Sequence, residues 1–205
     1  RPIFQEAKRR LEGKEVTHIR FQSIRDIPDV RDKRTWHGVF EKGASAFFDW
    51  GPHAVDYARF ASGLDVTTAQ GYLKHDPEQH RSPTSASFNF LMSNGATMTL
   101  AFISVTPVVP PDEPYFLFYY EGGYLAIHGY NYIEVNGEKV FEGEDFNPWF
   151  ELDRRFCEAV RAGDDSDLLN DYHDGLYSLG PILAAWESSR QGGQPIDVND
   201  YVEKA

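Results

Sequence analysis

The chain has 205 residues, a length that fits one large domain or two small ones. Hydrophobic residues make up 41% of it and aromatic residues 15%, as in a packed globular protein, and no apolar run approaches the roughly 20 residues that span a bilayer. The net charge of −12 argues against nucleic acid and against an anionic membrane surface as partners, because both attract clustered lysine and arginine.

Cysteine usage and the start of the chain bear on where the protein works. Cys157 is the one cysteine of the sequence, which excludes an intrachain disulfide and a multi-thiolate zinc site. Its helical setting predicts a buried structural thiol. With no visible signal peptide, we expect a cytoplasmic protein. The sequence begins at Arg1 and not at methionine, so we also expect a missing segment upstream.

The first third of the chain predicts two helices, one strand and a long loop. Pro2 suits the first turn of a helix and Gly13 its end, while alternating side chains then indicate a strand. A second helix is closed by Gly63. The predicted ranges are helix 2–12, strand 16–24, loop 25–43 and helix 44–62.

The remainder predicts a run of strands followed by two helices. Asn94-Gly95 and Asn136-Gly137 have the composition of hairpin turns, and Asn147 with Pro148 is typical of a helix start. This segregated order predicts an α+β fold with an open, largely antiparallel β-sheet and helices packed on one face, in a single domain over residues 1–205. The predicted ranges are strands 66–73, 85–92, 96–105, 115–120, 123–128, 132–135 and 139–142, helices 148–162 and 171–190, and an extended tail 195–198.

No glycine-rich loop of the GxGxxG or Walker type lies between a strand and a helix. The paired Gly122 and Gly123 lie between two predicted strands and indicate a turn. We therefore expect no nicotinamide cofactor to bind tightly to this chain alone.

The segment with the most chemistry is the second predicted helix, where Asp49, His53 and Asp56 are spaced i, i+4, i+7 and share one face. A histidine beside a carboxylate can accept a proton near neutral pH. Three interpretations stay open: a structural carboxylate–histidine pair, a metal site, or a catalytic and substrate-binding stripe. Pro52 predicts either a kinked helix or a helix that begins at Gly51 with Asp49 as N-cap.

Other candidates are less specific. Arg20, with its neighbour His18 on the first strand, is a candidate for contacting a substrate, although such residues are also common on sheet surfaces. His37 on the long loop is a candidate for bordering the pocket. The aromatic run Tyr115–Tyr120 indicates core and subunit interface first, and carbohydrate stacking second.

Four segments, in order along the chain, resemble the C-terminal domain of the glucose–fructose oxidoreductase, inositol dehydrogenase and MocA (Gfo/Idh/MocA) family. The resemblance extends from residue 1 to about residue 198. The segments are RPIFQEAKRRLEGKEVTHIRF, GASAFFDWGPHAVDYARFASG, FELDRRFCEAVRAG and DGLYSLGPILAAWESSRQGGQPIDV.

The resemblance implies a two-domain NAD- or NADP-dependent oxidoreductase acting on a sugar, inositol or related polyol. It matches Asp49 and His53 to the acid–base pair and Asp56 to an acid that contacts the substrate. The dinucleotide site and a lysine acting with the pair would lie in the N-terminal domain, which this sequence lacks. The resemblance also implies a homodimer or tetramer formed through the open sheet face.

Two other functions remain in view. The chain is also compatible with a non-catalytic binding or assembly module, because fold does not fix function. A metal-dependent hydrolase or isomerase that uses Asp49, His53 and Asp56 is the third hypothesis, although we assign no metal ligands to this chain.

Overall fold

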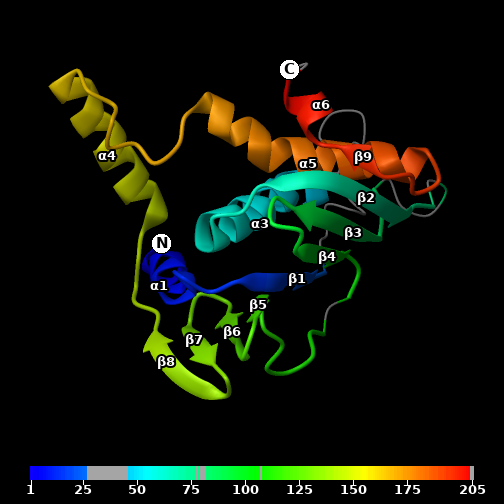
Figure 1. Cartoon of the computed structure of the whole chain (residues 1–205), viewed down its shortest axis with the longest axis horizontal. Coiled ribbons are helices and arrows are strands. Elements are labelled where there is room, and N and C mark those ends of the chain that lie inside the picture. The colour runs from blue at the N-terminus through cyan, green and yellow to red at the C-terminus, as the bar shows by residue number, and fades with distance from the viewer. Residues whose placement is uncertain (27–45, 77, 79–81, 107, 204–205) are drawn as a thin grey trace.

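The computed structural model describes residues 1–26, 46–76, 78, 82–106 and 108–203. The order of elements is one helix and one strand, a second helix, a run of strands, and two long helices followed by a short strand and a short helix (Figure 1). The bounds are α1 Pro2–Leu11, β1 Val16–Ile24, α3 Ala46–Ser62, β2 Val66–Lys74, β3 Ser85–Met92, β4 Thr97–Ile103, β5 Phe116–Tyr120, β6 Gly123–His128, β7 Tyr132–Val135, β8 Glu138–Glu142, α4 Pro148–Ala162, α5 Tyr172–Arg190, β9 Ile196–Asp197 and α6 Asn199–Val202.

Within the described ranges the strands form one sheet of nine, in the order β8-β7-β6-β5-β1-β4-β3-β2-β9. All neighbouring strands run antiparallel except β1 and β4, which are parallel. The predicted open, largely antiparallel sheet of an α+β fold is therefore confirmed. The first strand of the chain lies in the middle of the sheet, which places β1 between two groups of later strands.

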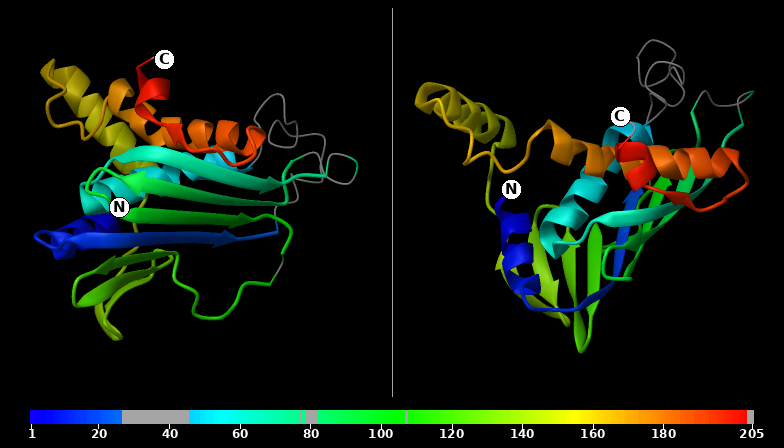
Figure 2. Two further views of the ribbon diagram at one scale, coloured as in Figure 1. Left: turned by 45° about the vertical axis from the view of Figure 1, so that its right-hand side comes forward. Right: turned by 45° about the horizontal axis from the view of Figure 1, so that its top comes forward.

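One face of the sheet carries the core. Helices α1, α3 and α5 lie against it (Figure 2), and their apolar residues form one cluster with those of the strands. Along β3 the side chains alternate, with Phe88 and Phe90 buried while Asn89 and Leu91 are exposed on the opposite face. This alternation is expected of an antiparallel sheet with one face packed and one face open.

Close backbone approach fixes α5 against the sheet. Gly71 of β2 donates its N–H to the buried Ser188 hydroxyl of α5 at 3.1 Å. A Cβ at Gly71 would collide with the carbonyl of Ala185, so only glycine allows this approach. At the other contact of α5, a Cβ at Gly51 of α3 would lie 2.9 Å from the Ile182 side chain.

The structure decides between the two alternatives for the second predicted helix, a kinked helix that contains Pro52 and a helix that begins at Gly51. Helix α3 extends from Ala46 to Ser62 with Pro52 inside it and with Asp49 in its first turn. The alternative in which the helix begins at Gly51 with Asp49 as its N-cap is therefore wrong. A proline at this position removes one helical hydrogen bond, and the packing of α3 on α1 and α5 compensates for it.

Helix α4 differs from the other long helices because it projects from the body of the protein (Figure 1). It begins at the predicted cap, where the Asn147 side chain accepts hydrogen bonds from two backbone N–H groups, and ends at Gly163 in the left-handed region. None of its residues is buried, and the predicted buried thiol is wrong because Cys157 on this helix is exposed. The sequence also missed the short helix α6.

No helix in the described part of the chain is both long and apolar enough to cross a membrane.

Candidate functional site

Helix α3 carries the predicted stripe on a partly exposed face. Ala54, Val55 and Ala58 are buried against the core, whereas His53 is exposed and Asp49 is half-buried in the first turn. The helix thus presents an imidazole to solvent while its apolar side anchors it. This arrangement leaves His53 available for contact with a ligand.

Aromatic rings hold His53 on both sides. Its imidazole stacks with the ring of Tyr57, one turn later, at 6.2 Å between centroids, and meets the edge of Trp50 at 6.1 Å. The guanidinium of Arg25 lies over the Trp50 ring at 3.9 Å, and this cation–π contact connects the residue that follows β1 to the first turns of α3. Trp50 and Tyr57, on the preceding and following turns of the same helix, therefore restrict the position of the His53 ring.

Tyr57 belongs to a tyrosine cluster that extends away from His53. Its ring stacks on Phe4 of α1 at 4.1 Å, and Phe4 in turn meets the edge of the Tyr130 ring at 6.3 Å. The Tyr130 ring also meets that of Tyr115, at 6.2 Å between centroids. Burial raises the pKa of Tyr57 well above its ordinary value and that of Tyr115 to about 12. Both phenols therefore stay protonated and act as hydrogen-bonding groups at neutral pH.

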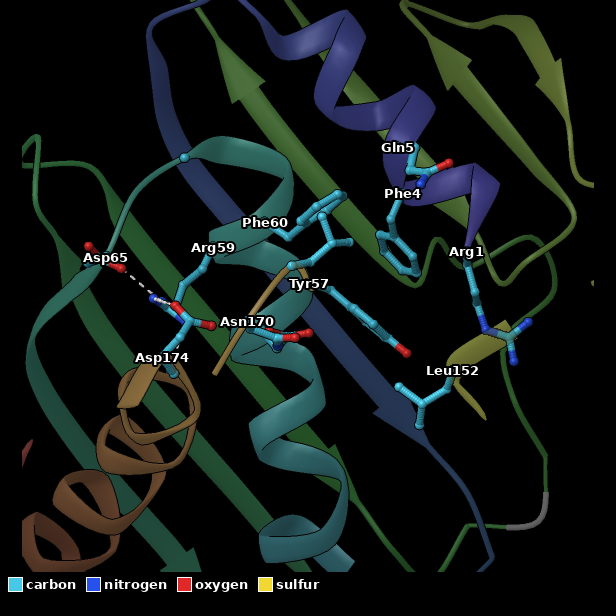
Figure 3. A pocket seen from close by; sticks show the side chains of 13 residues that line it. Arg1, Phe4, Gln5, Tyr57, Arg59, Phe60, Asp65, Leu152, Asn170 and Asp174 are labelled. Carbon is cyan, nitrogen blue, oxygen red and sulfur yellow. Dashed lines mark hydrogen bonds and ion pairs between the residues drawn. The ribbon is translucent and has the colours of Figure 1, made fainter. Parts of the chain in front are cut away.

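A cavity of about 500 Å³ opens beside this cluster, between α1, α3, α4, the segment that joins α4 to α5 and the first turn of α5 (Figure 3). Asp56 and Tyr57 line it, so Tyr57 is the residue that connects the cavity to His53, whereas Asp49 and His53 are not among the lining residues. The lining mixes aromatic rings with hydrogen-bonding side chains, a composition that suits a small polar ligand with an apolar face. The remaining lining residues are Arg1, Phe4, Gln5, Arg59, Phe60, Gly63, Asp65, Leu152, Leu169, Asn170 and Asp174.

Asp56 is a partly buried carboxyl that lines this cavity. Burial raises its pKa, and the nearby Asp174 adds to this, while Arg59, His53 and a hydrogen bond with Ser178 oppose it. The Ser178 hydroxyl lies 3.4 Å from the Asp56 carboxylate. A carboxyl with a raised pKa in a cavity is a group that can bind a ligand hydroxyl.

Arg59, near the C-terminal end of α3, connects several elements through its hydrogen bonds. Its guanidinium binds the carboxylates of Asp65 and Asp174, each at 2.8 Å, and donates to the Ser178 hydroxyl at 3.0 Å. It thereby joins α3 to the residue that precedes β2 and to the first turn of α5 (Figure 3). Since these acceptors satisfy most of its donors, Arg59 positions the cavity wall and leaves Asp56 free to face the cavity.

The structure brings together only some of the residues singled out in the sequence. Asp49, His53 and Asp56 lie on α3 as expected. Arg20 lies on the other face of the sheet: it is in register with Leu117, which lines a separate cavity on the open face, and it binds Glu113 at 2.7 Å. His37 lies outside the described residues.

Across the part of the chain that the structure describes, no three His, Cys, Asp or Glu residues are placed to hold a metal ion. Asp49, His53 and Asp56 therefore share a helix face without forming such a group.

Sequence reasoning missed Tyr57, Arg59 and Tyr130. The spacing i+4 from His53 was a signal for Tyr57, and the spacing i+3 from Asp56 was one for Arg59. No local signal marked Tyr130, because it reaches the cluster through sheet topology.

The turn between β5 and β6 consists of Glu121 and Gly122, and Gly123 is the first residue of β6. Among the described elements, no glycine-rich turn of the phosphate-binding kind joins a strand to a helix.

Residues 4–139 match the profile of a protein family described as the GFO/IDH/MocA C-terminal domain. This match covers more than half of the chain. Among curated proteins, no sequence matches the chain.

Solved structures with the same fold come from several bacteria. An oxidoreductase of Thermotoga maritima shares 18% sequence identity at a TM-score of 0.80, with 98% of this chain and 60% of that chain covered. An oxidoreductase of Agrobacterium radiobacter, solved with NAD+, L-tartaric acid and magnesium, shares 20% identity at 0.70, with 96% and 62% covered. The aldose–aldose oxidoreductase of Caulobacter crescentus, solved with glycerol, shares 15% identity at 0.75, with 95% and 60% covered. This chain thus spans about three-fifths of each of these proteins.

Proposed function

The chain belongs to the GFO/IDH/MocA family as a C-terminal domain of its oxidoreductases, and we propose that it is the substrate-binding part of an NAD- or NADP-dependent enzyme acting on a sugar or polyol. The observation that carries the proposal is the exposed His53, held between Trp50 and Tyr57, because Tyr57 also lines a cavity together with Asp56. A cytoplasmic location fits the same proposal.

Each side chain has a definite part in this proposal. His53 accepts the proton of the substrate hydroxyl that is oxidised, and Asp49 orients the imidazole from the preceding turn. Asp56 accepts a hydrogen bond from a second hydroxyl, which fixes the position of the substrate. The stacked Tyr57 restricts the imidazole and offers its phenol to the cavity.

The redox chemistry belongs to the dinucleotide, which exchanges a hydride with the substrate when bound. Because the described residues do not form a dinucleotide site, we assign that site to another domain of the enzyme. Two of the solved relatives support the choice of cofactor and substrate class, since one was solved with NAD+ and L-tartaric acid and the other is an aldose–aldose oxidoreductase.

The test is the replacement His53→Ala in the enzyme that contains this chain together with its dinucleotide-binding domain. Loss of the base is expected to lower kcat about 10²–10⁴-fold, the usual contribution of general acid–base catalysis, while dinucleotide affinity stays unchanged. His173→Ala is the matched control, because His173 is also exposed but lies on α5, where its ring meets the edge of Tyr177 instead of Tyr57. Turnover of polyols that is equal in the two variants would refute the role of His53.

A second candidate is a non-catalytic assembly module, and the open face of the sheet favours it. That face exposes Leu91 and Tyr119 and holds a cavity of about 520 Å³ lined by tyrosine and histidine side chains. In the assembly module, as in the proposed enzyme, two or four copies of the chain associate through the open face of the sheet. Stable self-association combined with no turnover on any polyol would favour the module over the enzyme.

A further inference from the structure

Helix α4 exposes a long apolar stripe. Trp149, Leu152, Phe156 and Val160 follow one another at intervals of three and four residues, so they lie on one side of the helix, and each is between 60% and 73% exposed. Phe150, at 66%, widens the stripe. Such a concentration of large apolar side chains on one helix marks an interaction surface, whereas single exposed apolar residues are ordinary.

The opposite side of α4 is already satisfied within the helix. Arg154 binds Glu151 and Glu158, each at 2.7 Å, and Arg155 also binds Glu151 at 2.7 Å. A helix with one ion-paired side and one apolar side is built to lie on a partner. Isolated helices of about 15 residues are marginal in water, so this helix needs that partner to be fully stable.

The position of α4 points to the kind of partner. Leu152 lines the same cavity as Arg1, so the first residue of the chain lies near the base of the helix (Figure 3). Polypeptide that precedes Arg1 would emerge beside the apolar stripe. The solved relatives are longer than this chain, which covers 60% to 62% of the two proteins from Thermotoga and Agrobacterium. The net charge of −12 disfavours an anionic membrane as the alternative.

We propose that the apolar stripe of α4 is the docking surface for the dinucleotide-binding domain of the same polypeptide, which enters upstream of Arg1. The inference rests on the proposed function, since it names the partner of the same site. Leu152 belongs to both the stripe and the cavity wall. Docking on α4 therefore sets the position of the part of the cavity wall that Leu152 forms, and couples domain placement to the substrate cavity.

The test measures amide hydrogen exchange of residues 148–162 in two proteins: this 205-residue chain, and the polypeptide made from its complete coding sequence. We expect exchange in α4 to be at least about 10-fold slower in the longer protein. Phe156→Glu, made in the longer protein, should abolish the extra protection, because a charge would be buried in the interface. The control Glu158→Gln, on the ion-paired side of the same helix, should retain it.

Other outcomes would overturn the docking proposal. A complete coding sequence that adds no domain upstream of Arg1 would do so, as would equal exchange of α4 in the two proteins. Protection that appears in the 205-residue chain and grows with its concentration would assign the stripe to a second copy. Protected α4 in an enzyme that turns over no sugar or polyol would refute the proposed function and leave the docking intact.

Discussion

Helices α3 and α4 are similar in length but differ in what surrounds them. Helix α3 packs between α1 and α5, with Val55 and Ala58 fully buried, and carries His53 on its exposed side. Helix α4 buries nothing and exposes its apolar stripe. The difference teaches that amphipathic pattern alone does not locate the core, because both helices have an apolar side and only one of them finds its partner within the described chain.

The largest expected difference concerns the arginines of the two helices. In α3, Arg59→Met keeps the packing of the aliphatic part of the side chain but leaves the carboxylates of Asp65 and Asp174 without their cation. The free energy of unfolding should fall by about 2–3 kcal/mol. This is less than for breaking a fully buried ion pair, because the two carboxylates are partly exposed. In α4, Arg154→Met removes only surface ion pairs, so its cost in unfolding free energy should be much smaller than that of Arg59→Met. Urea unfolding of both variants measures the two effects. Equal losses of unfolding free energy in the two variants would mean that the ion pairs of Arg59 do not stabilise the contact between α3 and α5.

A matched valine pair sharpens the comparison. Val55→Ala removes two methyl groups from the core and should cost about 1.5–2 kcal/mol of unfolding free energy. Val160→Ala makes the same change on the stripe of α4, where nothing is buried in this chain. Alanine has the better helix propensity by about 0.5 kcal/mol, so this second change should be neutral or slightly stabilising.

Urea unfolding of the 205-residue chain measures the valine pair as well. A clear loss of stability for Val160→Ala in this chain would show that the stripe is already covered, and would contradict the exposure of α4.

Much of the fold could be predicted because its signals are local. The hairpin turns at Asn94-Gly95 and Asn136-Gly137, and the cap at Asn147, mark the bounds of strands and helices within a few residues. The sheet order could not be predicted. Strand β1 pairs with β4 and β5, which follow it by some 80 and 100 residues, and nothing local in β1 specifies either partner.

The same limit applies to the candidate site. Helical spacing placed Asp49, His53 and Asp56 on one helix, but the cavity is closed by residues from other elements that only topology brings together. Alternation along β1 separates Arg20 from Phe21, yet the alternation does not say which face the helices cover. The packing of Phe21 on Phe116, next to Tyr57, shows that the helices cover the face opposite Arg20.

The smallest expected effect concerns how the stability of the protein depends on pH through one carboxyl of each helix, Asp56 of α3 and Glu151 of α4. Burial raises the pKa of Asp56 on α3, so the folded state holds its proton more tightly than the unfolded chain does. Its contribution to stability is therefore present at low pH and is lost as pH rises through the unfolded value, near 4, toward the raised folded value. Asp56→Asn should make the protein relatively more stable at pH 7 than at pH 4, compared with the unchanged chain.

Glu151 on α4 has the opposite sign. Hydrogen bonds from Arg154 and then Arg155 lower its pKa to about 2, so its contribution is present above the unfolded value and is lost as pH falls toward 2. Glu151→Gln should therefore cost stability at pH 7 and cost nothing at the acid end, although solvent screening keeps the effect small on an exposed helix. Thermal unfolding at a series of pH values measures both variants. The stability difference between each variant and the unchanged chain should change with pH in opposite directions for Asp56→Asn and Glu151→Gln. A change in the same direction would contradict the burial of Asp56, because desolvation raises the pKa of a carboxyl whereas an ion pair lowers it.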